Sequence, residues 1–307
     1  MALFLSIIIN NIAPIFLIIL IGFIIGKKFT IDIRSLTKIN IYVFVPALIF
    51  VKVYETQIDS ELIGAIVFAL ILMAIMNFII MAVSYLRKSK QSLANAMKNS
   101  VLFYNSGNLG LPLIMLLFDD LPYAVSIQIM VLLVNNLTTY TIGLYNANRG
   151  KMSILASIKS VLKMPSIYAV ALVFCFKLLP VDMTKAFFWP AAVFIKDGLV
   201  PIALLTLGVQ LSQSVLNIKN VDVYIASFLR LIFAPLVAYG LILIMGYDGI
   251  MAQVLLISSA VPTAVNTALI AVEFRNEPEF ASQVVLTTTV VSAITMSVII
   301  YIAQWIF

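Results

Sequence analysis

Ten long stretches of this chain are apolar and almost free of charge, and no other feature limits its possible folds as strongly. About 20 such residues in a helix cross the hydrocarbon core of a bilayer. Only 10% of the 307 residues are charged, compared with about 25% in soluble domains. The sequence therefore predicts an all-α integral membrane protein with ten transmembrane helices, at residues 5–26, 37–53, 62–86, 96–118, 122–146, 165–180, 190–212, 222–246, 250–273 and 283–306.

Charged side chains alternate in sign from one predicted loop to the next. Cytoplasmic loops are enriched in Lys and Arg, so we predict a multi-pass protein of the plasma membrane with both termini outside. The basic residues are spread over many loops and do not form the stripe that binds nucleic acid. The basic loops contain Lys27, Lys28, Arg34, Lys38, Arg87, Lys88, Lys90, Lys98, Arg149, Lys151, Lys159, Lys163, Lys219 and Arg275, and the alternate loops contain Glu55, Asp59, Glu61, Asp119, Asp120, Asp182 and Asp248, with Lys185 as an exception.

Several kinds of chemistry are excluded by the composition. The chain has no His, and Cys175 is its only cysteine. These counts exclude His-based catalysis, a disulfide framework and a metal site of the His/Cys kind. No pair of acidic residues faces each other at membrane depth in the predicted spans, as a membrane hydrolase would require. We therefore expect no enzyme activity, no metal and no cofactor.

Prolines recur at corresponding places in the two halves of the chain. The members of each pair are five spans apart, an odd number, so the second half would enter the membrane from the opposite side. This arrangement is typical of the inverted repeats of secondary transporters. We predict a first five-helix repeat at 1–148 and a second, inverted repeat at 149–307. The pairs are Pro14 with Pro165, Pro46 with Pro201, and Pro112 with Pro262.

Spans four and nine each contain a stretch that is unfavourable for a continuous helix. Span four contains Asn-Ser-Gly-Asn-Leu-Gly-Leu-Pro at 105–112, and span nine contains Ser-Ser-Ala-Val-Pro-Thr-Ala-Val-Asn-Thr at 258–267. Gly and Pro weaken the helical hydrogen-bond ladder, while Asn, Ser and Thr side chains can satisfy the freed backbone groups. We therefore predict two helices broken near the middle of the membrane, although Gly and Ser in span four also suit close helix packing.

The predicted breaks contain no acidic side chain. A cation or proton site inside a membrane is expected to include Asp or Glu as a countercharge. Two broken helices would instead direct their N-termini, each with about half a positive charge, into a shared cavity. This combination favours a carboxylate substrate, while amide and hydroxyl oxygens could still hold one Na⁺.

These motifs, in this order, resemble the auxin efflux carrier family. The resemblance rests on the stretch at 105–112, on Val-Pro-Thr-Ala-Val-Asn at 261–266, and on Leu-Thr-Leu-Gly at 205–208 after Pro201. It extends over essentially the whole chain. The family's bacterial members include malate and malonate permeases, and its plant members are the PIN auxin exporters. The short link between the two halves resembles the bacterial branch.

The resemblance implies a fold like that of the bile acid sodium symporters. Spans 1, 2, 6 and 7 would form a scaffold, and spans 3–5 and 8–10 would form a transport domain that moves as an elevator. The substrate would lie beside the crossing of spans four and nine at Pro112 and Pro262, and a homodimer would form through the scaffold. Asn105, Asn108 and Asn266 are the candidate substrate contacts.

Three charged side chains within the predicted spans are candidate gating or charge residues, because charges inside a membrane are commonly functional. Arg230 lies well inside span eight, where it can supply positive charge to an anion, form a structural ion pair or extend back to the interface. Lys196 and Asp197 precede Pro201 in span seven. They either neutralise each other or take part in a gate or a proton pathway.

The residue pattern favours a secondary carrier that moves a small mono- or dicarboxylate across the lipid bilayer by alternating access. A sodium-coupled symporter of organic anions is the alternative within the same class. A membrane-embedded sensor or receptor is the alternative from another class. A sensor is expected to contain a soluble signalling domain, and the predicted loops are too short for one.

Overall fold

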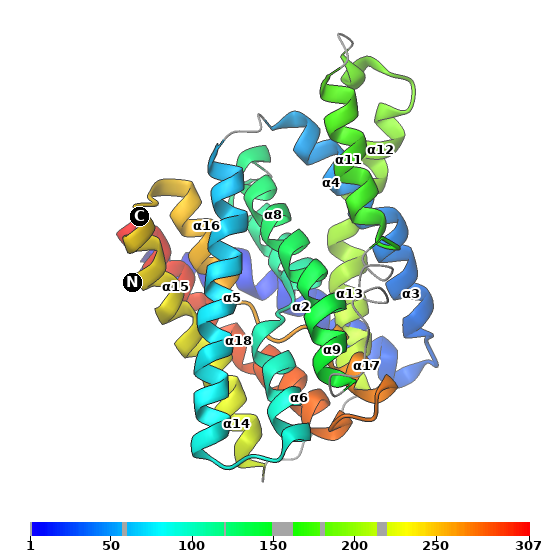
Figure 1. Ribbon diagram of the computed structural model, residues 1–307. Coiled ribbons are helices and arrows are strands. Elements are labelled where there is room, and N and C mark those ends of the chain that lie inside the picture. The colour runs from blue at the N-terminus through cyan, green and yellow to red at the C-terminus, as the bar shows by residue number, and fades with distance from the viewer. Residues whose placement is uncertain (1, 57–59, 120, 149–161, 179–181, 214–219) are drawn as a thin grey trace.

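The structure, a computed structural model, describes residues 2–56, 60–119, 121–148, 162–178, 182–213 and 220–307. All regular elements within these ranges are helices (Figure 1), so the predicted all-α class is confirmed for the described residues. Some charged residues used above to predict the orientation lie outside these ranges, namely Asp59, Asp120, Arg149, Lys151, Lys159 and Lys219.

Seven described helices are long and apolar enough to cross a membrane, and the chain is a multi-pass membrane protein. Each of them coincides with a predicted span. The span predicted at 37–53 is longer than expected, because its helix begins at Ile33 and ends at Glu55. The seven helices are Phe4–Lys28, Ile33–Glu55, Leu62–Leu86, Pro122–Ala147, Trp189–Ser212, Val221–Met245 and Pro278–Ile306.

The other three predicted spans contain shorter helices. The sixth is α11, Pro165–Lys177. The fourth and ninth are each divided into two half-helices by a short non-helical segment, so the predicted interruptions are present. Span four consists of α6 (Gln91–Leu102) followed by η3 (Ser106–Gly110) and α7 (Leu111–Leu117), and span nine consists of α16 (Gly249–Ser259) and α17 (Val265–Glu273).

Prolines explain why several long helices widen into a π-helical turn. Proline has no N–H, and its ring clashes with the carbonyl group four residues earlier, whereas the wider π turn moves that carbonyl group away. Pro14, Pro46 and Pro235 each follow such a turn by two residues. The elements are α1 (Ala2–Ser6), η1 (Ile7–Ile12) and α2 (Ala13–Lys28); α3 (Ile33–Ile39), η2 (Asn40–Phe44) and α4 (Val45–Glu55); and α14 (Val221–Phe228), η6 (Leu229–Phe233) and α15 (Ala234–Met245).

One group of helices is held together by close backbone contact and by aromatic side chains. α2 packs along α13, and α4 packs against α11 and α12. A Cβ atom at Gly208 would overlap the carbonyl oxygen of Ile19 on α2, which explains the glycine of the Leu-Thr-Leu-Gly motif. Phe50 on α4 lies with its ring centroid 5.8 Å from that of Trp189 on α12. The bounds of these two helices are α12 (Trp189–Asp197) and α13 (Leu199–Ser212).

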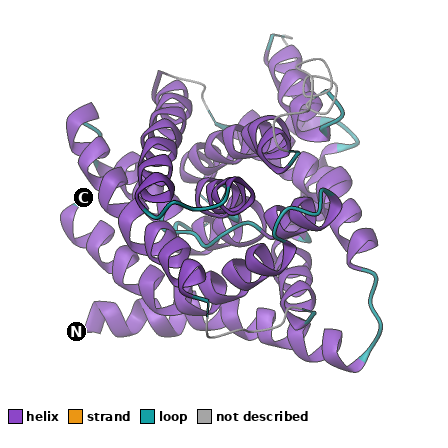
Figure 2. Ribbon diagram, turned by 60° about the horizontal axis from the view of Figure 1, so that its bottom comes forward, coloured by secondary structure: helices purple, strands orange, loops and turns teal. Residues whose placement is uncertain are grey.

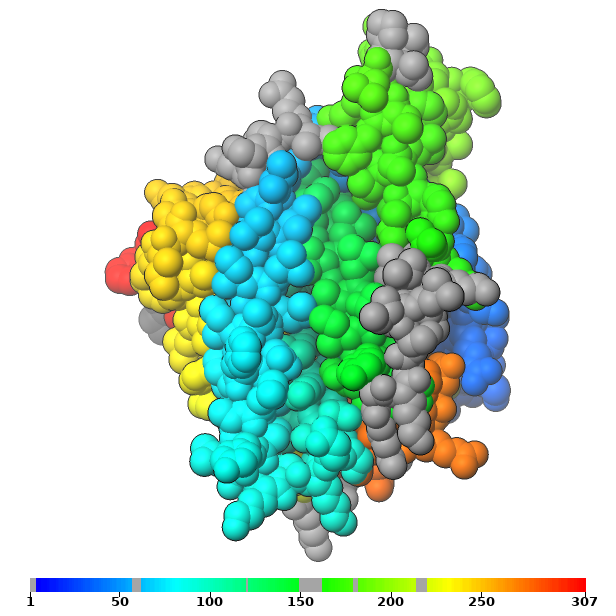
Figure 3. Space-filling view, in the orientation of Figure 1, coloured from blue at the N-terminus to red at the C-terminus, as the bar shows by residue number. Residues whose placement is uncertain are grey.

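A second group of helices packs around α5. α5 contacts α6, α8 and α15, while α18 contacts α14, α16 and α17. In the space-filling view, α5 forms part of the outer surface along most of its length (Figure 3). Its outward side chains are apolar and exposed, including Ile63, Leu70 and Phe78, as expected for a surface that faces lipid. The elements are α5 (Ser60–Leu86), α8 (Pro122–Thr138), η4 (Thr139–Gly143), α9 (Leu144–Ala147) and α18 (Pro278–Ile306).

The contact between α2 and α13 predicts a difference between two glycine substitutions. Gly208→Ala is expected to lower the thermal unfolding midpoint of the purified protein, because the added methyl group meets backbone, and such overpacking costs about 1–3 kcal/mol. Gly240→Ala in α15 is the matched control, since no atom lies within 4 Å of its Cβ position. That variant should unfold at or above the wild-type temperature, because alanine favours helix. Equal midpoints for the two variants would contradict the packing described.

Candidate functional site

The breaks in spans four and nine cross and pair through their backbones. Tyr104 and Thr263 form an isolated antiparallel β-bridge. The Asn105 N–H donates to the Pro262 carbonyl oxygen at 2.8 Å, and the Ala264 N–H donates to the Phe103 carbonyl oxygen at 3.0 Å. Loop segments run among the helices at the centre of Figure 2. The pairing satisfies backbone groups that would otherwise lie unpaired inside a membrane. Each such unpaired group would destabilise the fold by several kcal/mol.

Side chains from neighbouring helices satisfy most of the remaining polar groups at the crossing. Asn135 Nδ2 donates to the Tyr104 carbonyl oxygen at 2.7 Å and to Ser106 Oγ at 3.0 Å. Thr263 Oγ1 donates to the Ser100 carbonyl oxygen at 2.7 Å. The Thr263 N–H donates to Thr288 Oγ1 at 3.2 Å. The crossing is therefore fixed from α6, α8 and α18 at once.

The position of the break in span four corrects one prediction. We expected Pro112 to lie at the crossing, but the non-helical segment is at 103–105, and Pro112 lies beyond it in the first turn of α7. As at the other prolines, the π turn η3 precedes it and accommodates its ring. Pro262, by contrast, lies within the break of span nine and accepts a hydrogen bond there.

A cavity of about 490 Å³ lies beside the crossing. Both downstream half-helices begin at its wall, at Ser106 and at Val265. Because the first N–H groups of a helix have no partner within it, two partly positive ends face this cavity. The opposite walls come from η2, from η4 and from the beginning of α11, and they include Ile41, Tyr140 and Met164.

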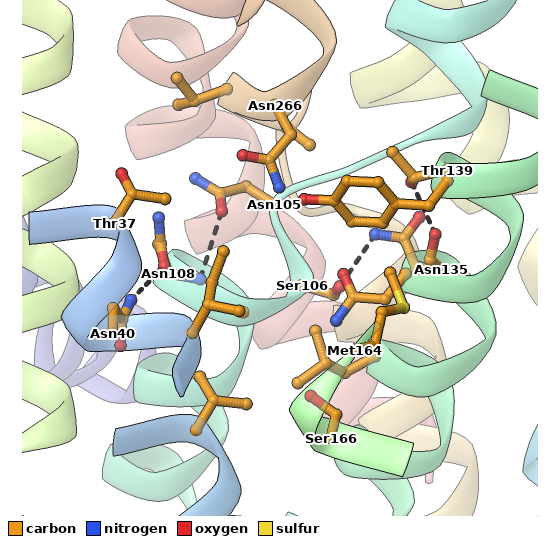
Figure 4. Close-up of a pocket in the computed structure, with 18 of the residues that line it drawn as sticks. Thr37, Asn40, Asn105, Ser106, Asn108, Asn135, Thr139, Met164, Ser166 and Asn266 are labelled. Carbon is orange, nitrogen blue, oxygen red and sulfur yellow. Dashed lines mark hydrogen bonds between the residues drawn. The ribbon is translucent and has the colours of Figure 1, made fainter. Parts of the chain in front are cut away.

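The asparagines predicted as substrate contacts are brought together in this cavity (Figure 4). Asn105 accepts a hydrogen bond from the Asn108 N–H at 3.2 Å, and its Nδ2 is buried without a partner. Asn108 Oδ1 accepts from Asn40 Nδ2 at 2.8 Å. The Asn266 side chain has no hydrogen bond to the described residues. The wall therefore offers amide groups that are free to bind a ligand.

The three charged candidates do not line this cavity. Arg230 is buried on another side of the crossing, where its guanidinium group lies against the Tyr104 ring. Lys196 Nζ lies 2.8 Å from Asp197 Oδ1 at the end of α12, so these two residues form an ion pair with each other. Charged side chains reach the described cavity wall at Lys163 and Glu273, both of which are exposed.

Several polar residues of the cavity were not predicted from the sequence. Asn135 and Asn136 interrupt the apolar span five, and that pair is a signal in the sequence. Asn40 and Thr37 come from the first turns of span two, where they read as ordinary interfacial residues. Their place in the cavity depends on how η2 packs, which no local pattern shows. The additional polar residues of the described lining include Thr37, Asn40, Tyr42, Tyr104, Ser106, Asn135, Asn136, Thr139, Tyr140 and Ser166.

Comparison with known proteins identifies the family. The sequence model of a family described as membrane transport protein matches residues 7–161 and 150–300. The chain belongs to this family of transporters. It is the auxin efflux carrier family that the motifs resemble, and its members are transporters and not enzymes.

Two curated relatives are also transporters. An uncharacterized transporter of Methanothermobacter thermautotrophicus is 23% identical over 273 residues, which cover 86% of this chain and 87% of the relative. An uncharacterized transporter of Methanocaldococcus jannaschii is 24% identical over 267 residues, which cover 83% of this chain and 85% of the relative. Both alignments extend over most of the fold described above.

The hydrogen bonds of Asn135 predict a stability difference between neighbouring asparagines. Asn135→Leu removes one of two donors from the buried Tyr104 carbonyl oxygen and leaves the buried Ser106 Oγ without its partner, so we expect a loss of about 1–3 kcal/mol and a lower unfolding midpoint. Asn136→Leu is the control, because the Asn136 side chain also lines the cavity but has no hydrogen bond to the described residues. Scanning fluorimetry in detergent measures both. A midpoint for Asn135→Leu at or above that of Asn136→Leu would contradict the role given to Asn135.

Proposed function

We propose that this protein is a secondary transporter of small organic anions and that the carboxylate of its substrate binds at the crossing. The observation that carries the proposal is the shared cavity at which two half-helices begin. Each N-terminus carries about half a positive charge. At the first of them, the Ser106 and Asn108 N–H groups already donate to the Tyr104 carbonyl oxygen and to Asn105 Oδ1. Asn105, Asn108 and Asn266 add amide groups to the same wall.

The charges of the cavity support an anion over a cation. Glu273 is the one acidic residue in the described lining, and it is exposed at the end of α17. A bare cation held at the crossing would have amide and hydroxyl oxygens but no carboxylate as a countercharge. Lys163, on the other side of the cavity, is exposed and attracts anions.

Sodium coupling is a second candidate, because some oxygen atoms near the crossing are unpaired. Ser100 Oγ, Gln128 Oε1 and Ser258 Oγ are buried and have no hydrogen-bond partner in the described part of the chain. Oxygen atoms of this kind are suitable ligands for a hard cation. A sodium ion bound there would accompany the organic anion across the membrane.

We also propose that transport uses an elevator movement within a five-plus-five inverted repeat. The group around α2, α4 and α13 would be the scaffold, and the group around α5 and α18 would be the transport domain. The extensive packing of α2 against α13 within the first group and of α5 against α6 and α8 within the second supports the division, and the two groups meet where α4 contacts α8 and α13 contacts η3 and α7. From the loop charges we propose a plasma-membrane protein with both termini outside and a cavity open to the cytoplasm. The homodimer through the scaffold is proposed from the family resemblance alone.

Uptake into proteoliposomes tests the substrate class. We expect saturable uptake of at least one of radiolabelled malate, malonate and indole acetate, because the site is built for a carboxylate. Asn108→Ala should reduce that uptake at least about tenfold, a loss of about 1.4 kcal/mol. Asn77→Ala, on α5 and outside the cavity, is the control and should transport at the wild-type rate.

Cation flux without uptake of any of the three anions would contradict the anion proposal. Wild-type uptake by Asn108→Ala would contradict the location of the site and leave the substrate class standing. A dependence of the uptake on an inward sodium gradient would support the sodium-coupled candidate, and indifference to that gradient would reject it.

A cysteine cross-link tests the proposed movement. Thr56 Oγ1 on the scaffold side lies 2.7 Å from Ser126 Oγ on α8. In a Cys175→Ser background, oxidation of Thr56→Cys/Ser126→Cys should stop transport, and reduction should restore it, because the bond joins the two bodies. The single variants Thr56→Cys and Ser126→Cys, each in the same background, are the controls, because neither has a second cysteine with which to form an intramolecular disulfide.

Each single-cysteine control should transport equally well under oxidising and reducing conditions. Full activity of the oxidised Thr56→Cys/Ser126→Cys protein would contradict an elevator movement between these two groups of helices. Mass spectrometry of the intact protein confirms that the bond between positions 56 and 126 has formed.

A further inference from the structure

Arg230 is a buried cation in the middle of the helical bundle. It lies in the π turn η6, and only 2% of its surface is exposed. Its Nη1 donates to the Val101 carbonyl oxygen at 2.9 Å, and its Nη2 donates to the Ser259 carbonyl oxygen. Its guanidinium carbon lies 4.6 Å from the centroid of the Tyr104 ring. Arg230 therefore contacts both broken spans.

Within the described part of the chain, no acidic side chain balances the charge of Arg230. No Asp or Glu of the described residues forms a salt bridge with it, and its Nε is buried without a hydrogen-bond partner. A charge inside a membrane without compensation is strongly unfavourable. Its compensation here comes from the ends of helices: Val101 is in the last turn of α6, and Ser259 is the last residue of α16.

The crossing brings four helix ends together, and without Arg230 their partial charges would largely cancel at the cavity. The C-termini of α6 and α16 each carry about half a negative charge, and the N-termini that begin at Ser106 and Val265 each carry about half a positive charge. The four ends nearly cancel when summed. A cation bound to the two C-termini removes their negative contribution and leaves the positive N-termini facing the cavity.

Tyr104 connects Arg230 to the cavity. Its ring contacts the guanidinium group, and the same residue lines the cavity beside Asn105. Asn105 Nδ2 is buried there without a partner, and the Asn105 residue is only 6% exposed. The cavity wall thus combines an unpaired donor with the field of a buried cation close behind it.

We propose that Arg230 is a positioning residue that makes the crossing selective for anions, because it neutralises the carbonyl ends of α6 and α16. This inference rests on the proposed anion carrier. In this proposal, the preference for a negatively charged substrate depends on a residue that does not contact the substrate. The positive potential at Asn266 and Asn108 should therefore depend on the charge at position 230.

Charged thiol reagents measure this potential without any substrate. The protein carries Asn266→Cys in a Cys175→Ser background, and its reaction rates with an anionic and a cationic methanethiosulfonate are compared at low ionic strength. Arg230→Gln should lower the ratio of the anionic to the cationic rate at least about fivefold, because it removes a unit positive charge buried behind the cavity wall. Arg230→Lys keeps the positive charge but cannot donate to the Val101 and Ser259 carbonyl oxygens in the same way. Its rate ratio should lie within about twofold of the wild-type ratio.

The two variants separate charge from packing. A purely structural role would change the ratio equally in Arg230→Lys and Arg230→Gln, and that result would overturn the proposal. If Arg230→Gln does not fold, the measurement uses intact Arg230 and compares Asn266→Cys, in the first turn of α17, with Leu144→Cys, at the beginning of α9 in the lining of the same cavity. The proposal then predicts a ratio at least about fivefold higher at position 266, and equal ratios would overturn it.

The outcome is independent of the uptake assay. If the protein transports none of the three anions but shows the predicted change in the rate ratio, the proposed substrates are wrong and the electrostatic role of Arg230 stands. A protein that carries an anion but shows equal ratios for Arg230→Gln and wild type would keep the proposed function without this role for Arg230.

Discussion

The structure depends on backbone hydrogen bonding between two broken helices inside the bundle. A break in a membrane helix exposes N–H and C=O groups that neither lipid nor the helix can satisfy. Here each break supplies the partners for the other, through the Asn105–Pro262 and Ala264–Phe103 hydrogen bonds. Neither break is stable alone, which explains why a sequence with two such interruptions brings them to the same point.

Once the breaks cross, the electrostatics of the site follow from helix direction. Two helices end at the crossing and two begin there, so carbonyl ends and N–H ends lie close together. Arg230 binds the carbonyl ends, and the N–H ends remain open to the cavity with Asn105, Asn108 and Asn266. The same geometry that satisfies the backbone thus supports the proposed anion site, in which the positive potential comes from helix N-termini and from Arg230 behind the wall.

The sequence predicts the spans well and the site in part. Apolar runs define a helix because lipid requires it, and the Gly, Pro and Asn stretches of spans four and nine reveal both breaks. Pro112 was expected to mark the break of span four, but it lies in the first turn of α7, where the preceding π turn accommodates its ring. Asn40 reaches Asn108 from a helix 68 positions earlier in the chain, and Arg230 joins Val101 and Ser259 from two other spans. Such partners depend on tertiary packing, and no local pattern encodes them.

The central claim is that the crossing binds the carboxylate of an organic anion. A structure of the protein determined in the presence of the anion that it carries tests this claim most directly. The account predicts density for the carboxylate between the N-terminus at Ser106 and the N-terminus at Val265, within hydrogen-bonding distance of Asn108 or Asn266. Density for the anion elsewhere, with only water at the two N-termini, would contradict it.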